Sequence, residues 1–202
     1  ASFGAAIYGT LDKEKLITNY IFRDKNDVVG MKIGATTRLQ SNGISISFAP
    51  HATLFKQPFT FNKENYISLD RELNIRGNIE MLDTITYSGM NLYATSDTLN
   101  KRDISLELFN IDLQTATKML PYAPNMSGII NADMHYREDA PGTIISSDIR
   151  SDSLTYEGTL IGNETLEFSY FPKNSNEHHA YLTLLHNNTD IAKLEGIYNS
   201  DS

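Results

Sequence analysis

Residues 110–128 read NIDLQTATKMLPYAPNMSG, and this is the one stretch of the chain whose pattern predicts a helix. Asp112 is a suitable N-cap, because its carboxylate can accept a hydrogen bond from an unpaired N–H of the first turn. Pro121 and Pro124 cannot continue a helix and are expected to end it. We therefore predict one short helix near residues 112–120. The residues spaced to share one helical face, and expected to contact the strands, are Leu113, Ala116, Thr117 and Leu120.

The rest of the chain alternates apolar and polar residues with the period of two that is typical of β-strands. Residues 44–48 are an example, in which Ile44, Ile46 and Phe48 alternate with serines. After the helix, Gly128 is expected to open a new strand. Strands of this kind recur about every 8–12 residues and number roughly ten to fourteen. The sequence thus predicts an all-β fold: a long curved antiparallel sheet folded into a taco-like trough or a sandwich.

Length and charge restrict the classes of function. We interpret residues 1–202 as a single β domain, and the strand-like sequence at both ends favours a fragment of a longer protein. The net charge of −8 would repel an anionic nucleic acid, so we expect no nucleic-acid partner. The absence of cysteine excludes disulfides and thiolate metal sites. No apolar run approaches the ~18–20 residues that span a bilayer.

Three histidines near the C-terminal end form the densest group of possible metal ligands. His178, His179 and His186 lie close in sequence to Glu177 and Asp190. On a strand, however, His178 and His179 would point to opposite faces and would not share a metal ion. We therefore predict neither a metal site nor a cofactor.

Two pairs of carboxylates are candidate catalytic groups, namely Asp148 with Asp152 and Glu164 with Glu167. Glycoside hydrolysis needs two carboxylates that face each other across a cleft, and nothing in the pattern distinguishes these pairs from solvated turns. Nucleophile elbows, phosphate-binding glycine loops and zinc-protease helices are absent from the sequence. The sequence therefore predicts a non-enzymatic protein without catalytic residues.

The strongest pattern is a stripe of apolar side chains that would line one face of the sheet. Two interpretations remain open: an ordinary sandwich core, or a groove that holds acyl chains of lipids, each buried methylene contributing about 0.8 kcal/mol. The candidate groove residues are Ile44, Ile46, Phe48, Leu73, Ile75, Ile79, Met81, Ile104, Leu106, Leu108, Leu166, Phe168, Tyr170, Leu182 and Leu184.

The helical segment and the strands after it resemble the AsmA-like, TamB-type family of translocation and assembly proteins, as found in Bacteroidetes-like bacteria. The resemblance rests on IDL at residues 111–113, MLP at 119–121 and SGIINA at 127–132. The strand-turn-strand phrase of that family is similar to residues 58–77, and the similarity covers residues 44–198.

The resemblance implies an elongated, periplasmic β structure with a hydrophobic interior. It also implies that the full-length protein is anchored in the inner membrane. Such a protein would carry phospholipid to the outer membrane, or assist protein assembly there beside an Omp85-type barrel. The partners expected on this basis are phospholipids or their acyl chains, and the barrel through parts outside this chain.

A second hypothesis is a closed β-sandwich that acts as an adhesion or glycan-binding module on the cell surface. Sugars stack on exposed aromatic rings, so this hypothesis requires tyrosines that gather on one platform. The candidates are Tyr93, Tyr136, Tyr156 and Tyr198.

Overall fold

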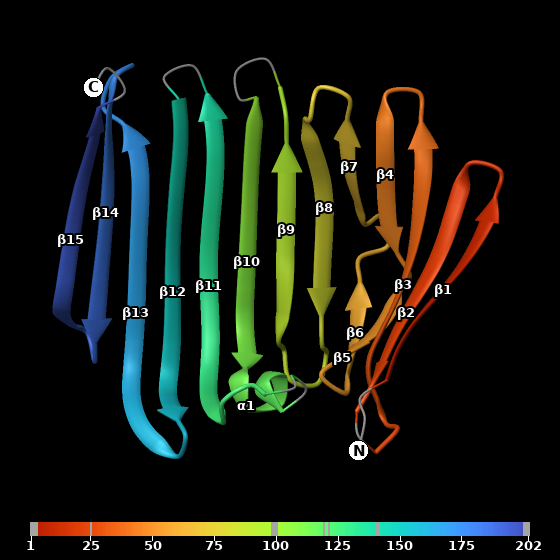
Figure 1. Cartoon of the computed structure of the whole chain (residues 1–202), viewed down its shortest axis with the longest axis horizontal. Helices are drawn as coiled ribbons and strands as arrows, with labels where there is room; N and C mark the ends of the chain where they lie inside the picture. The colour runs from red at the N-terminus through yellow and green to blue at the C-terminus, as the bar shows by residue number, and fades with distance from the viewer. Residues whose placement is uncertain are drawn as a thin grey trace. The chain divides into compact units, whose positions relative to one another are not determined.

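The computed structural model describes residues 4–24, 26–97, 101–118, 120, 122–139 and 142–199. Fifteen strands form a single antiparallel sheet, and one short helix accompanies them (Figure 1). The predicted all-β class, the antiparallel sheet and the single helix are confirmed. The chain divides into two compact units, Ala1–Tyr93 and Ala94–Ser202.

The first unit consists of antiparallel strands joined mostly by short turns. Its strands are β1 (Gly4–Asp12), β2 (Lys15–Arg23), β3 (Val29–Gln40), β4 (Gly43–Phe48), β5 (His51–Leu54), β6 (Gln57–Phe61), β7 (Tyr66–Asp70) and β8 (Ile75–Leu82), followed by β9 (Gly89–Thr95), in which the boundary between the units falls. The β5–β6 hairpin lies off the main order of the sheet, because β5 pairs with β3 and β6 pairs with β8.

The first unit has a packed core of its own. Phe59 is 3% exposed, and Ile79 and Met81 of β8 are also buried. The rings of Phe48 and Phe61 stack with their centroids 5.1 Å apart. Burial of this kind is what the apolar stripe predicts for a sandwich-like core, and each fully buried large side chain contributes about 1.5–3 kcal/mol.

The second unit is a meander in which neighbours in sequence are neighbours in the sheet. Its elements are β10 (Arg102–Asp112), α1 (Leu113–Thr117), β11 (Met126–Asp139), β12 (Gly142–Tyr156), β13 (Thr159–Pro172), β14 (Glu177–His186) and β15 (Thr189–Asn199). The β14–β15 turn is a two-residue one, Asn187 and Asn188, both with positive φ, which is the backbone that tight hairpins require.

The helix forms where the sequence predicts it but is shorter. Asp112 is the N-cap, and its Oδ1 accepts a hydrogen bond from the Gln114 N–H at 2.9 Å. The helix ends at Thr117, whose hydroxyl donates to the Leu113 carbonyl at 2.7 Å. Leu120 lies beyond the helix and is 57% exposed, so the prediction that it packs on the strands is wrong.

Two further predictions concern the residues that follow the helix. Met119 and Pro121, which carry part of the family resemblance, lie outside the described residues. The strand after the helix begins at Met126, two residues before Gly128.

Gly128 instead occupies a β-bulge between β11 and β12, where the register shifts between Ser127 and Ile129. Its φ is +128°, and a Cβ at this position would lie 2.9 Å from the carbonyl oxygen of Asp152. Both the backbone conformation and the close approach therefore require glycine.

Gly128→Ala should destabilise the protein by about 1–3 kcal/mol, because the new methyl group meets backbone and the dihedral angle is strained. Urea denaturation followed by circular dichroism measures the change. Gly4→Ala is the matched control, since its nearest atom would be 3.9 Å away. Equal stability of the two variants would contradict the account of Gly128.

Candidate functional site

The second unit carries three rows of mostly apolar residues that cross its strands β10–β15. Cross-strand register places the members of each row opposite one another, and side chains two residues apart share a face. We call this surface the apolar face. Its first row is Ile104, Tyr136, Ile145, Tyr170, Ala180 and Gly196; its second is Leu106, Met134, Ser147, Phe168, Leu182 and Leu194; its third is Leu108, Ala132, Ile149, Leu166, Leu184 and Ala192.

A β-bulge extends the apolar face at the helix end of β10. The register shifts between Leu108 and Ile111, with Asn110 in a left-handed conformation at φ 54°. The Asn110 N–H donates to the Asn131 Oδ1 at 2.9 Å, which satisfies a donor that the bulge leaves unpaired. As a result Ile111 lies opposite Ile130 and continues the apolar face, although its odd spacing from Leu108 would otherwise turn it away.

The opposite side of the same strands is polar. One row there contains four carboxylates on four neighbouring strands: Glu107, Asp133, Asp148, Glu167, Thr183 and Lys193. The Arg150 guanidinium lies 2.6 Å from Asp148. This contact, with smaller contributions from Asp133 and Glu167, raises the pKa of Arg150 above its usual value. The alternation therefore places this row of charged side chains on the side opposite the apolar face.

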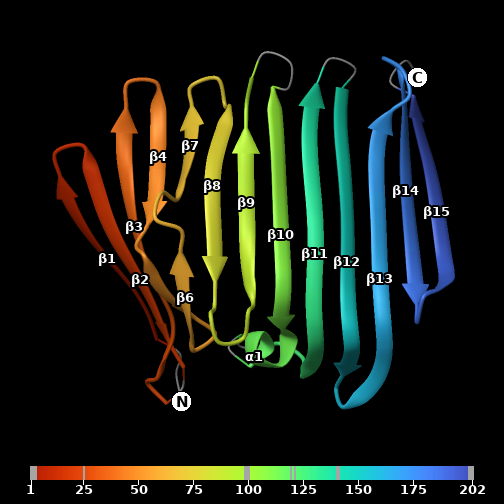
Figure 2. The ribbon, with the colours of Figure 1, turned by 180° about the vertical axis from the view of Figure 1, so that it is seen from behind.

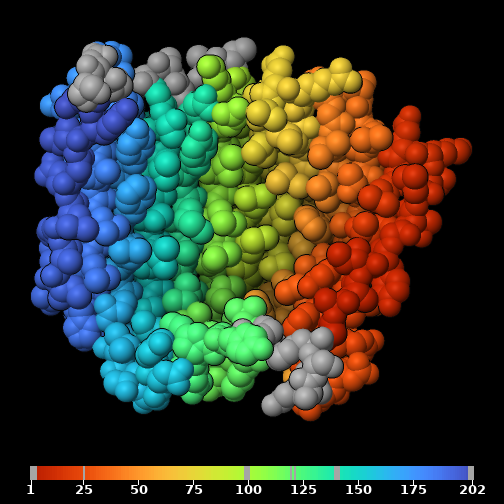
Figure 3. Space-filling model, in the orientation of Figure 1, coloured from red at the N-terminus to blue at the C-terminus, as the bar shows by residue number. Residues whose placement is uncertain are grey.

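No second layer of this unit covers the apolar face in the described part of the chain. Seen from the front and from behind, β10–β13 form a single layer (Figures 1 and 2). Figure 3 shows α1 at one end of the strands of this unit, and the helix contacts β10 and β11. Among the described residues of the apolar face only Ala132, at 3% exposure, is buried, whereas Phe168 and Leu182 are half-buried.

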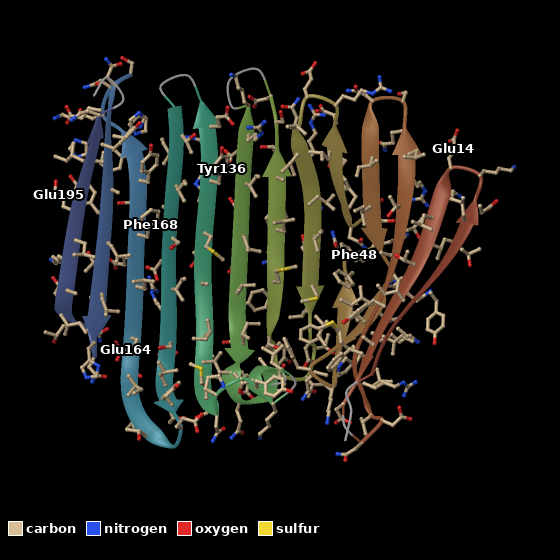
Figure 4. All side chains as sticks on the ribbon, viewed as in Figure 1. Glu14, Phe48, Tyr136, Glu164, Phe168 and Glu195 are labelled. Atoms are coloured by element: carbon tan, nitrogen blue, oxygen red, sulfur yellow. The ribbon has the colours of Figure 1, made fainter. Side chains whose placement is uncertain are left out.

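Polar pairs border the apolar face at both ends of the strands. At one end Arg102 lies 2.5 Å from Glu138, and Tyr170 hydrogen-bonds to His178 at 3.0 Å. At the other end the His186 Nδ1 lies 2.5 Å from Glu164. Figure 4 labels Glu164 and Phe168, four residues apart on β13, and Tyr136 on β11. On β13 the three rows run from Leu166 to Tyr170, four residues apart, so they cover about 14 Å along the strand.

The structure separates the histidines as the sequence predicts. His178 contacts Tyr170, on the apolar face, whereas His179 stacks on Phe171 on the other side of the sheet. His179 and Lys173 both bond to Glu177 and hold the pKa of that carboxyl below its usual range. Among the described residues, no group of three or more His, Cys, Asp or Glu side chains is placed to hold a metal ion.

The carboxylate pairs do not converge either. Glu164 contacts His186 at the border of the apolar face, whereas Glu167 belongs to the polar row on the other side. Asp148 pairs with Arg150, while Asp152 lies past it toward the bulge opposite Ile129.

The fifteen candidate groove residues fall into three groups. Eight lie together on the apolar face of the second unit: Ile104, Leu106, Leu108, Leu166, Phe168, Tyr170, Leu182 and Leu184. Six lie on strands of the first unit, where Ile79 and Met81 are buried in its core: Ile44, Ile46, Phe48, Ile75, Ile79 and Met81.

Leu73, the remaining candidate, was expected to continue the alternation of β8, and this is wrong. It lies in the β7–β8 turn with φ 63° and is 60% exposed. Its N–H donates to the Asp70 carbonyl at 3.1 Å, and the Asp70 carboxylate accepts from the N–H groups of Glu72 and Asn74. The Asn74 side chain and the N–H groups of Asn74 and Glu72 lower the pKa of the Asp70 carboxyl. Together these bonds fix a turn in which the Leu73 side chain is exposed.

The candidate list also omits residues that complete the apolar face. The candidates of this unit lie on β10 and on β13–β14, and residues of the strands between them complete the rows. These residues are Met134 and Tyr136 of β11 and Ile145 and Ile149 of β12. Their alternation is visible in the sequence, but only the register places them in the same rows.

The tyrosines of the second hypothesis are not gathered on a platform in this unit. Tyr136 lies opposite Ile145, near one end of β11, whereas Tyr156 lies opposite Met126 at its other end. Tyr198 is on β15, four strands from Tyr136. Tyr93, in the first unit, donates a hydrogen bond to Glu80 at 2.8 Å.

Comparison of the chain with protein-family models, with curated proteins and with solved structures gave no significant match. Within the described residues, no helix has the length and apolar character needed to cross a membrane.

An open apolar face and a sealed core differ in the cost of removing a phenyl ring. Phe168→Ala should destabilise by about 1–2 kcal/mol, because the ring is only partly buried, whereas Phe59→Ala in the packed core should cost about 3–5 kcal/mol. Urea denaturation of both variants measures the difference. A cost at Phe168 equal to that at Phe59 would mean that the face is sealed.

Proposed function

We propose that the second unit holds acyl chains of phospholipids on its apolar face, as a non-enzymatic segment of an envelope-spanning protein. The observation that carries the proposal is the register that aligns three apolar rows across six strands with no covering layer among the described residues. A sheet with one apolar face must cover it with something, and a flexible hydrocarbon chain is one such cover.

The dimensions of the apolar face suit an acyl chain. Six strands spaced about 4.8 Å apart give a surface roughly 24 Å across, and the three rows cover about 14 Å along the strands. Each methylene transferred from water to this surface contributes about 0.8 kcal/mol, up to the limit set by incomplete enclosure. The free energy of binding would thus increase with the number of methylenes in the acyl chain. It would not depend on any particular recognition group.

The borders of the apolar face suit the polar part of a lipid. Arg102 and His178 lie at one end, and His186 at the other, each beside an acceptor. Such groups can hydrogen-bond to a headgroup at the water boundary while the hydrocarbon lies between them. The net charge of −8 favours a zwitterionic headgroup over an anionic one.

The wider setting follows from the resemblance to the TamB-type family. On that basis we propose a periplasmic location, in a protein anchored in the inner membrane, with phospholipid transport to the outer membrane or protein assembly there as its role. An Omp85-type barrel would be a partner of parts outside this chain. The carboxylates considered as catalytic groups are engaged otherwise: Glu164 contacts His186, and Asp148 contacts Arg150.

Site-specific photo-crosslinking tests the proposal. A benzoylphenylalanine at position 168 or 182, on the apolar face, should capture phosphatidylethanolamine from vesicles. The same group at position 167 or 183 is the matched control, because these neighbours point to the polar side of the same strands. Capture at 168 and 182 at several times the control level is the expected result.

Equal capture at all four positions, or capture at none of them, would contradict the proposal. Phe168→Asp provides a second measurement, since a charge in the middle row should reduce lipid captured at position 182 while the circular dichroism spectrum is unchanged.

A further inference from the structure

The two borders of the apolar face are not equivalent. One lies beside α1, and the other lies at the opposite end of β10, where Arg102 begins the strand (Figure 1). The border away from α1 contains two tyrosines of the first row, together with three polar side chains that lie just beyond that row on the same side of the sheet. We call it the tyrosine border, and its residues are Arg102, Tyr136, Glu138, Tyr170 and His178.

Both tyrosines direct their hydroxyl groups out of the apolar rows toward the polar side chains of this border. The Tyr136 hydroxyl donates a hydrogen bond to the Glu138 carboxylate at 3.4 Å, and the Tyr170 hydroxyl lies 3.0 Å from the His178 Nδ1. The rings of Tyr170 and His178 are stacked with their centroids 5.7 Å apart. Tyrosine combines an apolar ring with a polar hydroxyl and is therefore typical of a boundary between hydrocarbon and water. These two tyrosines mark such a boundary at one end of the apolar face.

The border beside α1 is more apolar, and its polar groups bind one another. The Glu164 carboxylate lies 2.5 Å from the His186 Nδ1, and the His186 Nε2 accepts a hydrogen bond from the Asn187 side-chain amide at 2.8 Å. Both ring nitrogens of His186 therefore have partners within the chain. Toward α1 the register continues this border with Ile130 and Ile111. A lipid headgroup would find better partners at the tyrosine border.

The tyrosine border carries charges of both signs. The Arg102 guanidinium lies 2.5 Å from the Glu138 carboxylate, and the two side chains are 29% and 24% exposed, so both are within reach of a ligand. A guanidinium attracts a phosphate group, whereas a carboxylate attracts an ammonium group. A zwitterionic phospholipid headgroup contains both of these groups. The ammonium of ethanolamine has N–H donors for the carboxylate, whereas the trimethylammonium of choline has none.

We propose that the tyrosine border binds the headgroup of an ethanolamine phospholipid, whose acyl chain extends over the apolar rows toward α1. This inference rests on the lipid-binding function proposed above and adds the orientation of the lipid and the class of its headgroup. The phosphate lies next to Arg102 and His178, and the ammonium donates hydrogen bonds to the Glu138 carboxylate. Tyr136 and Tyr170 contact the part of the lipid where hydrocarbon gives way to polar groups.

Two lysophospholipids with the same palmitoyl chain test the class of headgroup. The full chain should bind 1-palmitoyl-lysophosphatidylethanolamine at least about fivefold more tightly than its choline analogue, as measured by isothermal titration calorimetry below the micelle concentration. Glu138→Gln removes the charge that holds the ammonium and should reduce this ratio of dissociation constants to less than about twofold. Because both ligands are measured on one variant, a general loss of stability cancels in the ratio. Glu167→Gln, the same change on the polar side of the sheet, is the control and should keep the wild-type ratio.

Intermolecular Overhauser effects test the orientation without any substitution. The ethanolamine methylene protons should contact the ring protons of Tyr136 and Tyr170. Headgroup contacts to Ile130, at the border beside α1, or to neither border would overturn the orientation.

Equal binding of the two lysophospholipids by the wild-type chain, or an unchanged ratio in Glu138→Gln, would overturn the class of headgroup. In each of these cases lipid binding itself would stand, so the failure belongs to this inference alone. If neither lysophospholipid binds, the proposed lipid-binding function is wrong and this inference is wrong with it.

Discussion

The cross-strand register of β10–β15 is the constraint on which the structure of the second unit depends. Side chains alternate between faces along each strand, so a slip of one residue in any pair would move that strand's apolar side chains to the polar side. In the observed register the apolar residues of six strands fall into common rows. The bulge at Asn110 maintains this alignment where the spacing of Leu108 and Ile111 would break it. The apolar face therefore depends on the register between the strands as much as on the alternation within each strand.

The two units resolve the same sequence pattern in different ways. In the first unit, Phe59, Ile79 and Met81 are buried in a packed core. In the second unit most members of the three rows are half-buried and those on β15 are exposed, and among the described residues α1, a helix of five residues, is the one non-strand element beside β10 and β11. A period of two cannot distinguish these outcomes, because it reports which side of a strand is apolar and not what covers that side. The sequence pattern therefore cannot decide between a sealed core and an open groove.

Other features were predictable to different degrees. The alternation of Leu166, Phe168 and Tyr170 identifies β13 directly, and Asp112 correctly marks the start of the helix. The predictions for Leu73 and Leu120 are wrong because an apolar residue next to a turn can match the period by chance. Hydrogen bonds to the Asp70 carboxylate place Leu73 in a turn, and the early end of the helix leaves Leu120 outside it. That Met134 and Ile149 belong to the apolar face could not be predicted from the sequence. It follows from the cross-strand register, which depends on turns and bulges rather than on composition.

The central claim is that the apolar face of the second unit is open and takes hydrocarbon. Nuclear magnetic resonance of the methyl-labelled chain with 1-palmitoyl-lysophosphatidylethanolamine tests it most directly. The account predicts intermolecular Overhauser effects from the palmitoyl chain to Leu106 and Leu182, and none to Thr165 and Thr183 on the opposite side of the same sheet. Contacts spread equally over both faces, or no contacts at all, would contradict it.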